Sequence, residues 1–210
     1  LSEEDVLGHA LLKMRDELRA RERVLADKVK ERTEEVVRQK EEVEKQSGKV
    51  AELYKNVTDS IRYAKRLQES ILPPEARVKE LLPESFVLYR PKDIVSGDFY
   101  WVEPVGDKVV FAAVDCTGHG VPGAFMSLVG HNGLNQVVKE RGTLRPLEVL
   151  HQLNEIAFDT LHKDRGRFVR DGMDMALCVL DPDSMILDYA GANCPLYLVR
   201  DGAVVQFASN

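Results

Sequence analysis

The sequence lacks a long apolar run, a basic block and cysteines at metal-ligand spacing. No stretch reaches the roughly 20 uncharged residues of a membrane span, so we expect this segment neither to contact a membrane nor to open with a signal peptide. With 29 basic and 35 acidic residues and no basic block, nucleic acid is not an expected partner. Three cysteines without CxxC spacing make a disulfide framework or zinc site unexpected, and they indicate a cytoplasmic location.

Proline is absent from residues 1–72, which hold two glycines, whereas residues 73–210 hold nine prolines and twelve glycines. This change in composition predicts a long helix over residues 1–72 and a second domain over residues 73–210. Pro73 and Pro74 end the helix, because proline cannot donate a helical hydrogen bond and disfavours helix in the residue before it.

Apolar residues recur every seventh position along the helix, a pattern typical of a coiled coil. The repeat comprises Val29, Val36, Val43, Val50, Val57, Ala64 and Ile71. Polar seam residues such as Arg32 and Gln39 weaken the pairing, and a stutter is expected between Leu25 and Val29. We predict a homodimer through residues 25–72, with a solvated spacer helix as the alternative.

The first turns resemble a known signalling element. Residues 1–18 are similar to the end of a HAMP module, with acidic residues, then Gly8, then Met14 before the coil. The resemblance implies a sensor and membrane spans upstream in the parent protein. A histidine kinase is not favoured, because residues 56–74 contain no histidine next to an acidic residue.

The rest of the sequence alternates short apolar runs with turn signals. Strands are expected over residues 86–89, 98–102, 108–114, 174–180, 185–190, 196–200 and 204–207. Apolar residues at helical spacing predict helices over residues 122–140 and 146–162. Antiparallel sheet layered with helices gives the α+β class.

Two glycine-containing loops place carboxylates at strand ends. These segments are DIVSGDFYW, which contains Asp98, and AVDCTGHGVPGAF, which contains Asp115. Carboxylates and loop carbonyls are the ligands that Mg²⁺ and Mn²⁺ prefer. Strand-end aspartates beside glycines also occur in ordinary turns, so the residues alone leave both interpretations open.

Five segments in the same order carry a family resemblance. They are SIRYAKRLQESILPP, FVLYRPKDIVSGDFYW, AVDCTGHGVPGAFMSLVG, DGMDMALCVL and YAGANCPLYLVR. Residues 60–210 resemble the SpoIIE-type bacterial serine phosphatases of the PPM (protein phosphatase 2C-like) superfamily. The resemblance implies a PPM-type α-β-β-α sandwich after the coil. It also implies hydrolysis of phosphoserine or phosphothreonine by water held between two metal ions, Mn²⁺ or Mg²⁺.

The resemblance assigns roles to individual residues. Asp98 matches the first acidic residue of the metal site, Asp115 the carboxylate that bridges both metals, and Cys116 a main-chain carbonyl ligand. His119 is either a proton donor to the leaving serine oxygen, a residue that orients the site, or a loop histidine held by packing. Asp174 faces the site as a structural or supporting residue.

One family element is missing from this pattern. The late DG-x-x-[DE] aspartate that closes the metal site is not found before Asn210, so we expect a truncated domain that binds metal weakly and turns over poorly. The phosphatase activity is then that of the parent domain. The expected substrate is a regulatory phosphoprotein, such as an anti-sigma-factor antagonist, with activity regulated through the coil.

Two other functions are compatible with parts of this sequence pattern. A catalytically inactive adaptor would dimerise through the coil and bind a partner. A diguanylate cyclase is not favoured, because its helices do not fit between Pro74 and Gly97. The basic cluster of Lys163, Arg165, Arg167 and Arg170 is either a solvated flap or a docking surface for an acidic phosphoprotein.

Overall fold

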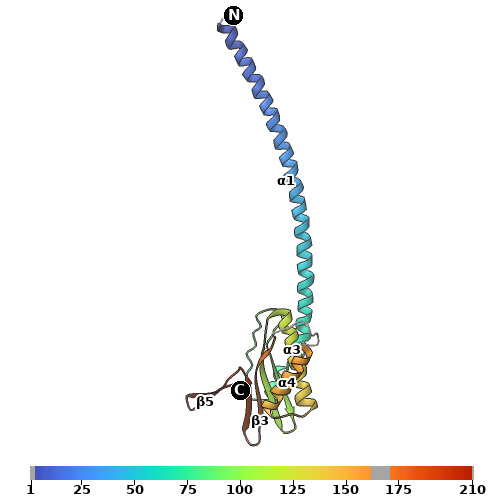
Figure 1. The fold of residues 1–210 in the computed structure, drawn as a ribbon, viewed down its shortest axis with the longest axis vertical. Helices are drawn as coiled ribbons and strands as arrows, with labels where there is room; N and C mark the ends of the chain where they lie inside the picture. The colour runs from blue at the N-terminus through green and yellow to red at the C-terminus, as the bar shows by residue number, and fades with distance from the viewer. Residues whose placement is uncertain (1–2, 162–170, 210) are drawn as a thin grey trace. The chain divides into compact units, whose positions relative to one another are not determined.

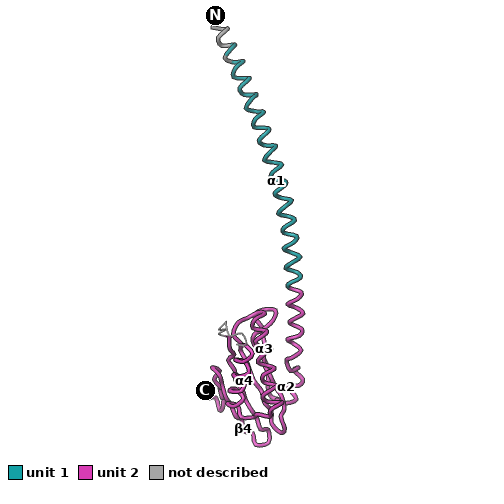
Figure 2. The backbone as a smooth tube through the Cα atoms, turned by 45° about the vertical axis from the view of Figure 1, so that its right-hand side comes forward, with its two compact units in different colours: residues 1–57 teal, residues 58–210 magenta. Residues whose placement is uncertain are grey.

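A computed structural model of the chain describes residues 3–161 and 171–209. The chain divides into two compact units, residues 1–57 and residues 58–210 (Figure 2). Contacts therefore place the boundary within the first helix, whereas composition places it at Pro73. The predicted basic cluster falls within residues 162–170, outside the described residues.

The first unit belongs to α1 (Glu3–Glu69), which no proline interrupts. The heptad valines from Val29 to Val57 form an uncovered apolar stripe, with each side chain 57% to 65% exposed. Opposite charges pair along the same helix, as in Arg32 with Glu35 at 2.8 Å. Exposed pairs of this kind contribute about 0.3–0.5 kcal/mol each, so they do not determine the fold. Within residues 3–161 and 171–209, no helix combines the length and apolarity that crossing a bilayer requires.

The second unit contains the sheets. Its main sheet is antiparallel, in the order β1 (Phe99–Val105), β2 (Lys108–Cys116), β3 (Met173–Asp181) and β4 (Ile186–Ala192). A separate hairpin is formed by β5 (Leu196–Arg200) and β6 (Ala203–Phe207). The helices are α2 (Glu75–Leu81), α3 (Gly120–Leu134) with its continuation η1 (Asn135–Glu140), and α4 (Pro146–Leu161).

The core lies between the main sheet and the helices on one of its faces. Figure 1 shows α3 and α4 beside the sheet. Trp101 of β1 and Leu134 of α3 are at most 1% exposed in this core. On the opposite face, Val78 of α2 packs with Val102 and Val109. The alternation of strand side chains supplies both faces, and the α+β class is confirmed.

The expected strand over residues 86–89 is wrong. These residues pair with no described strand, and Phe86 and Leu88 are largely exposed. Apolar composition suits a strand, but a strand also needs a hydrogen-bonding partner, which composition does not reveal. Helix α2 was not expected, and the predicted helix over residues 122–140 finishes in the π-helical turns of η1. Apolar spacing does not separate α from π turns over so few residues.

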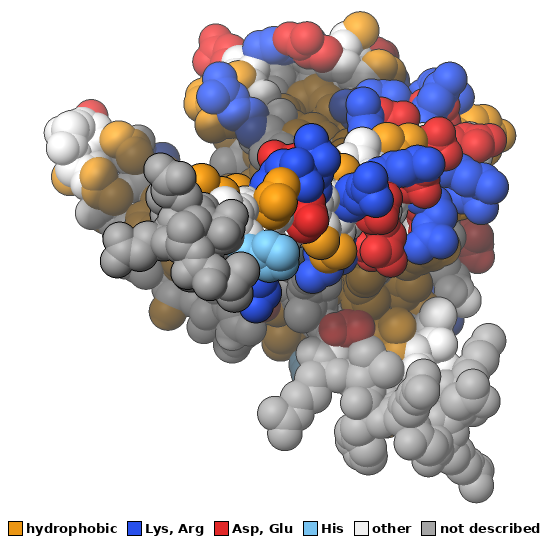
Figure 3. Space-filling model, turned by 90° about the horizontal axis from the view of Figure 1, so that it is seen from above, with side chains coloured by type: hydrophobic (Ala, Val, Ile, Leu, Met, Phe, Trp, Pro, Cys, Tyr) orange, Lys and Arg blue, Asp and Glu red, His pale blue; other side chains and the backbone are white. Residues whose placement is uncertain are grey.

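Charges of both signs cover the surface. On the face shown in Figure 3, basic and acidic side chains are interspersed with apolar ones. One such pair in the second unit joins Lys139 of η1 to Glu103 of β1 at 2.9 Å. The face in view carries no patch of a single sign.

Candidate active site

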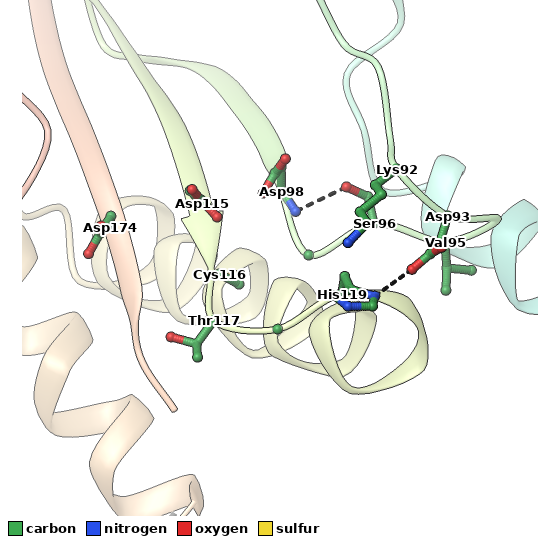
Figure 4. Close-up of a pocket in the computed structure, with 12 residues that line it drawn as sticks. Lys92, Asp93, Val95, Ser96, Asp98, Asp115, Cys116, Thr117, His119 and Asp174 are labelled. Carbon is green, nitrogen blue, oxygen red and sulfur yellow. Dashed lines mark hydrogen bonds and ion pairs between the residues drawn. The ribbon is translucent and has the colours of Figure 1, made fainter. Parts of the chain in front are cut away.

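Three aspartates lie side by side at one end of the main sheet (Figure 4). Asp115 of β2 is paired with Asp174 of β3, and Asp98 immediately precedes Phe99, which pairs with Val114. Residues opposite one another on neighbouring strands project to the same face. Strand register therefore sets Asp98, Asp115 and Asp174 in one row.

These carboxylates line an open pocket of about 410 Å³. Cys116, which ends β2, and His119, at the start of α3, line the same pocket. The structure thus brings Asp98, Asp115, Cys116 and His119, the residues singled out from the sequence, to one place. It also brings Asp174 to the pocket, held by a 2.9 Å hydrogen bond from Asn193 Nδ2 to its Oδ1.

The carboxylates of this row repel one another when no cation neutralises their charge. Burial raises the pKa of Asp98, and a hydrogen bond to Asp115 and the charge of Asp115 raise it further. Like charges opposite one another on a sheet destabilise it. Burial also raises the pKa of the Cys116 thiol to about 12, so that side chain stays protonated at neutral pH.

The two loops of the site touch through their backbones. A Cβ on Gly97 would lie 2.7 Å from the carbonyl oxygen of Gly118 and 3.0 Å from that of Cys116. A Cβ on Gly123 would lie 2.5 Å from the same Gly118 oxygen. Atoms this close must shift, so glycine at both positions allows the loop before Asp98 to pack against the loop after Asp115.

A buried glutamine, which the sequence did not single out, ties the end of α1 to this loop. Gln68 is 5% exposed. Its Nε2 donates to the carbonyl oxygen of Ser96 (2.6 Å) and to Ser127 Oγ (2.8 Å), and its Oε1 accepts from the Ser96 N–H (2.9 Å). Ser96 Oγ accepts in turn from the N–H of Asp98 (3.0 Å). A path of hydrogen bonds therefore runs from α1 to Asp98. The sequence did not predict it, because a glutamine in a charged helix carries no signal of burial.

Removing the charge of Asp98 is expected to stabilise the cation-free domain at neutral pH. Because the folded-state pKa of Asp98 is raised, its stabilising contribution is present below the unfolded pKa and is lost as pH rises through the folded one. In EDTA, Asp98→Asn should melt above the wild type at pH about 7, with the gain shrinking towards pH about 3. Asp188→Asn, on the exposed part of β4, is the matched control, and a lower Tm for Asp98→Asn at neutral pH would contradict the prediction.

Comparison with known proteins finds a family model and solved structures that are similar to this chain. A family model described as Stage II sporulation protein E (SpoIIE) matches residues 105–209. The SiaA-PP2C domain of Pseudomonas aeruginosa is 30% identical, with a TM-score of 0.65 over 74% of this chain and 61% of that one. No curated protein sequence matches the chain.

Two further solved structures are more distant. A stage II sporulation E family protein from Thermanaerovibrio acidaminovorans is 21% identical, with a TM-score of 0.41 over 51% of each chain. The RsbU and RsbW domains of Rv1364c from Mycobacterium tuberculosis are 22% identical, with a TM-score of 0.41 over 56% of this chain and 31% of that one. The chain spans less than two thirds of the length of each of these three structures.

Proposed function

This chain belongs to the SpoIIE family, and we propose that its second unit is a phosphatase domain that hydrolyses phosphoserine or phosphothreonine on a regulatory protein. One observation carries the proposal. Asp98 and Asp115 lie side by side at one end of the main sheet and line an open pocket, and their like charges repel one another unless a cation is bound.

The donor atoms suit Mn²⁺ or Mg²⁺. Asp98 and Asp115 offer carboxylate oxygens and Cys116 a carbonyl oxygen, the ligand type that hard divalent ions prefer. Within the described residues, no group of three or more His, Cys, Asp and Glu side chains could hold a metal ion, so these two carboxylates form a partial ligand set. Phosphatases of this family generally depend on Mn²⁺ or Mg²⁺, and we propose the same dependence here. A bound pair of ions would lower the pKa of a water molecule and neutralise charge on the phosphate.

We also propose roles for two other residues that line the pocket. His119 lies at the mouth of the pocket, and we assign it the proton donated to the leaving serine oxygen. Asp174, oriented by Asn193, supports the row of carboxylates. The resemblance to SpoIIE-type phosphatases favours a regulatory phosphoprotein substrate, such as an anti-sigma-factor antagonist.

Three free thiols suit a reducing compartment, and we propose that the domain acts in the cytoplasm, downstream of a HAMP-like segment of a membrane-anchored parent.

Hydrolysis assays test the proposal. This chain and, in parallel, the full-length protein are assayed with a phosphoserine peptide and with p-nitrophenyl phosphate in Mn²⁺, Mg²⁺ or EDTA. With either metal, we expect turnover by the full-length protein and weaker turnover by this chain, and no turnover by either protein in EDTA. No turnover by either protein with any metal would overturn the catalytic proposal and favour the inactive adaptor.

We propose that the coil dimerises through residues 25–72, because the valine stripe is uncovered in a single chain. Replacing both Val50 and Val57 with aspartate places charges in the apolar seam, and we expect analytical ultracentrifugation to show a monomer in place of a dimer. Ala51→Asp with Lys55→Asp, on the outer face of the same turns, should leave the dimer intact.

The same variants test regulation through the coil. An unchanged mass for the seam variant would refute the predicted dimer. A monomer with wild-type phosphatase activity would refute coupling between the coil and the site.

A further inference from the structure

Asp93 and His119, which both line the pocket, lie within hydrogen-bonding distance of one another. The Nδ1 atom of His119 lies 2.7 Å from Oδ2 of Asp93, and Figure 4 marks this contact. We propose that Asp93 is the positioning residue that holds the His119 imidazole through its Nδ1–H, which leaves Nε2 to serve the leaving serine oxygen. The inference rests on the proposed phosphatase function and adds Asp93 to its machinery.

The backbone on both sides of His119 adopts a conformation that favours glycine. Gly118 and Gly120, on either side, have φ values of 89° and 66°, a left-handed conformation that favours glycine. His119 itself is extended, with φ −129° and ψ 170°, and occupies the N-cap position of α3 without a side-chain capping hydrogen bond. A Cβ on Gly120 would lie 3.5 Å from Oδ2 of Asp93, so the carboxylate sits directly against the turn.

The contact between His119 and Asp93 contributes too little to the free energy of unfolding to be explained by a role in folding. The side chains of His119 and Asp93 are 67% and 41% exposed, and exposed ion pairs contribute only about 0–1 kcal/mol to stability. A protonated imidazole at a helix N-terminus also faces the positive end of the helix dipole. Asp93 supplies the opposite charge next to that ring, while Lys92, Asp98 and Asp115 line the same pocket.

The proton transfer follows from this arrangement. As a water molecule attacks phosphorus and the bond between phosphorus and the serine oxygen breaks, the electron pair of that bond goes to the serine oxygen, which takes the proton from Nε2 of the imidazolium. His119 is then neutral and keeps its Nδ1–H on Asp93. The attacking water becomes the hydroxyl group of hydrogen phosphate, and the proton that it loses to the solvent balances the one that returns to Nε2. A serine alkoxide is a poor leaving group and needs this proton, whereas p-nitrophenolate is a stable anion and does not.

Two substrates with different leaving groups therefore distinguish a loss of His119 positioning from general damage to the active site. Asp93→Ala should lower kcat on the phosphoserine peptide by about 10- to 100-fold and change kcat on p-nitrophenyl phosphate by less than about twofold. His119→Ala should show the same selectivity, and the double variant should lose little more, because the two residues act as one unit. Asp188→Ala is the matched control. Equal losses on both substrates, or no loss on the peptide, would overturn the proposal.

A second measurement needs no turnover. In a pH titration followed by ring ¹⁵N shifts, the neutral form of His119 should carry its proton on Nδ1, and Asp93→Ala should move that proton to Nε2. The resonance is identified by its loss in His119→Ala. A wild-type proton on Nε2 would overturn the inferred hydrogen bond whether or not the chain is a phosphatase. With the proton on Nδ1 but no turnover by any variant, the proposed function fails, and the role of Asp93 in it fails too.

Discussion

Asp115→Asn is expected to abolish metal-dependent hydrolysis, with a loss of at least about 10²- to 10³-fold in kcat. Asp115 is the middle carboxylate of the row, between Asp98 and Asp174, and we propose that it is the ligand shared by the two ions. Asparagine keeps the shape of the side chain but removes its negative charge and one acceptor oxygen. The measurement is the rate of phosphoserine peptide hydrolysis across a Mn²⁺ titration.

Stability distinguishes a lost ligand from a lost fold. Because the Asp115 charge raises the pKa of Asp98, removing that charge relieves a repulsion, and the cation-free variant should melt no lower than the wild type. Asp188→Asn makes the same change on an exposed part of β4 and should keep full activity. Wild-type turnover by Asp115→Asn would remove this residue from the proposed metal site.

Gln68→Leu is expected to lower the free energy of unfolding of the second unit by about 2–4 kcal/mol. Leucine fits the size of the side chain but leaves the N–H and the carbonyl oxygen of Ser96 without the partner that Gln68 supplies. It also removes a donor to Ser127 Oγ, a side chain that is fully buried. Trp101 is the sole tryptophan and is 1% exposed in the core of this unit, so its fluorescence follows the transition in denaturant.

An exposed glutamine of the same unit provides the control. Gln206 of β6 is exposed, so Gln206→Leu should change the free energy of unfolding of this unit by less than about 0.5 kcal/mol. Gln68→Leu should also weaken phosphatase activity, since Ser96 holds the N–H of Asp98. Equal, small effects for the two glutamine variants would show that the buried network carries no stability.

Local patterns in the sequence were enough for most of the fold. The absence of proline predicted α1, the periodicity of apolar residues predicted α3, α4 and six of the strands, and their order predicted the α+β class. Each of these signals depends on residues a few positions apart, where propensity and patterning act. Loop chemistry and family resemblance likewise singled out Asp98, Asp115, Cys116 and His119, which the structure places at one pocket, although their roles remain predictions.

Tertiary structure alone decided the relations between distant segments. The family resemblance predicted that Asp174 faces the site, but its place next to Asp115 depends on the register between β3 and β2, because a shift of one residue would turn its side chain to the other face. Gln68 is buried although it sits in a charged helix, because two loops converge on it. Asp93 meets His119 across 26 positions of sequence. Strand register and burial are settled by packing between segments far apart in the chain, and local residue patterns do not encode that packing.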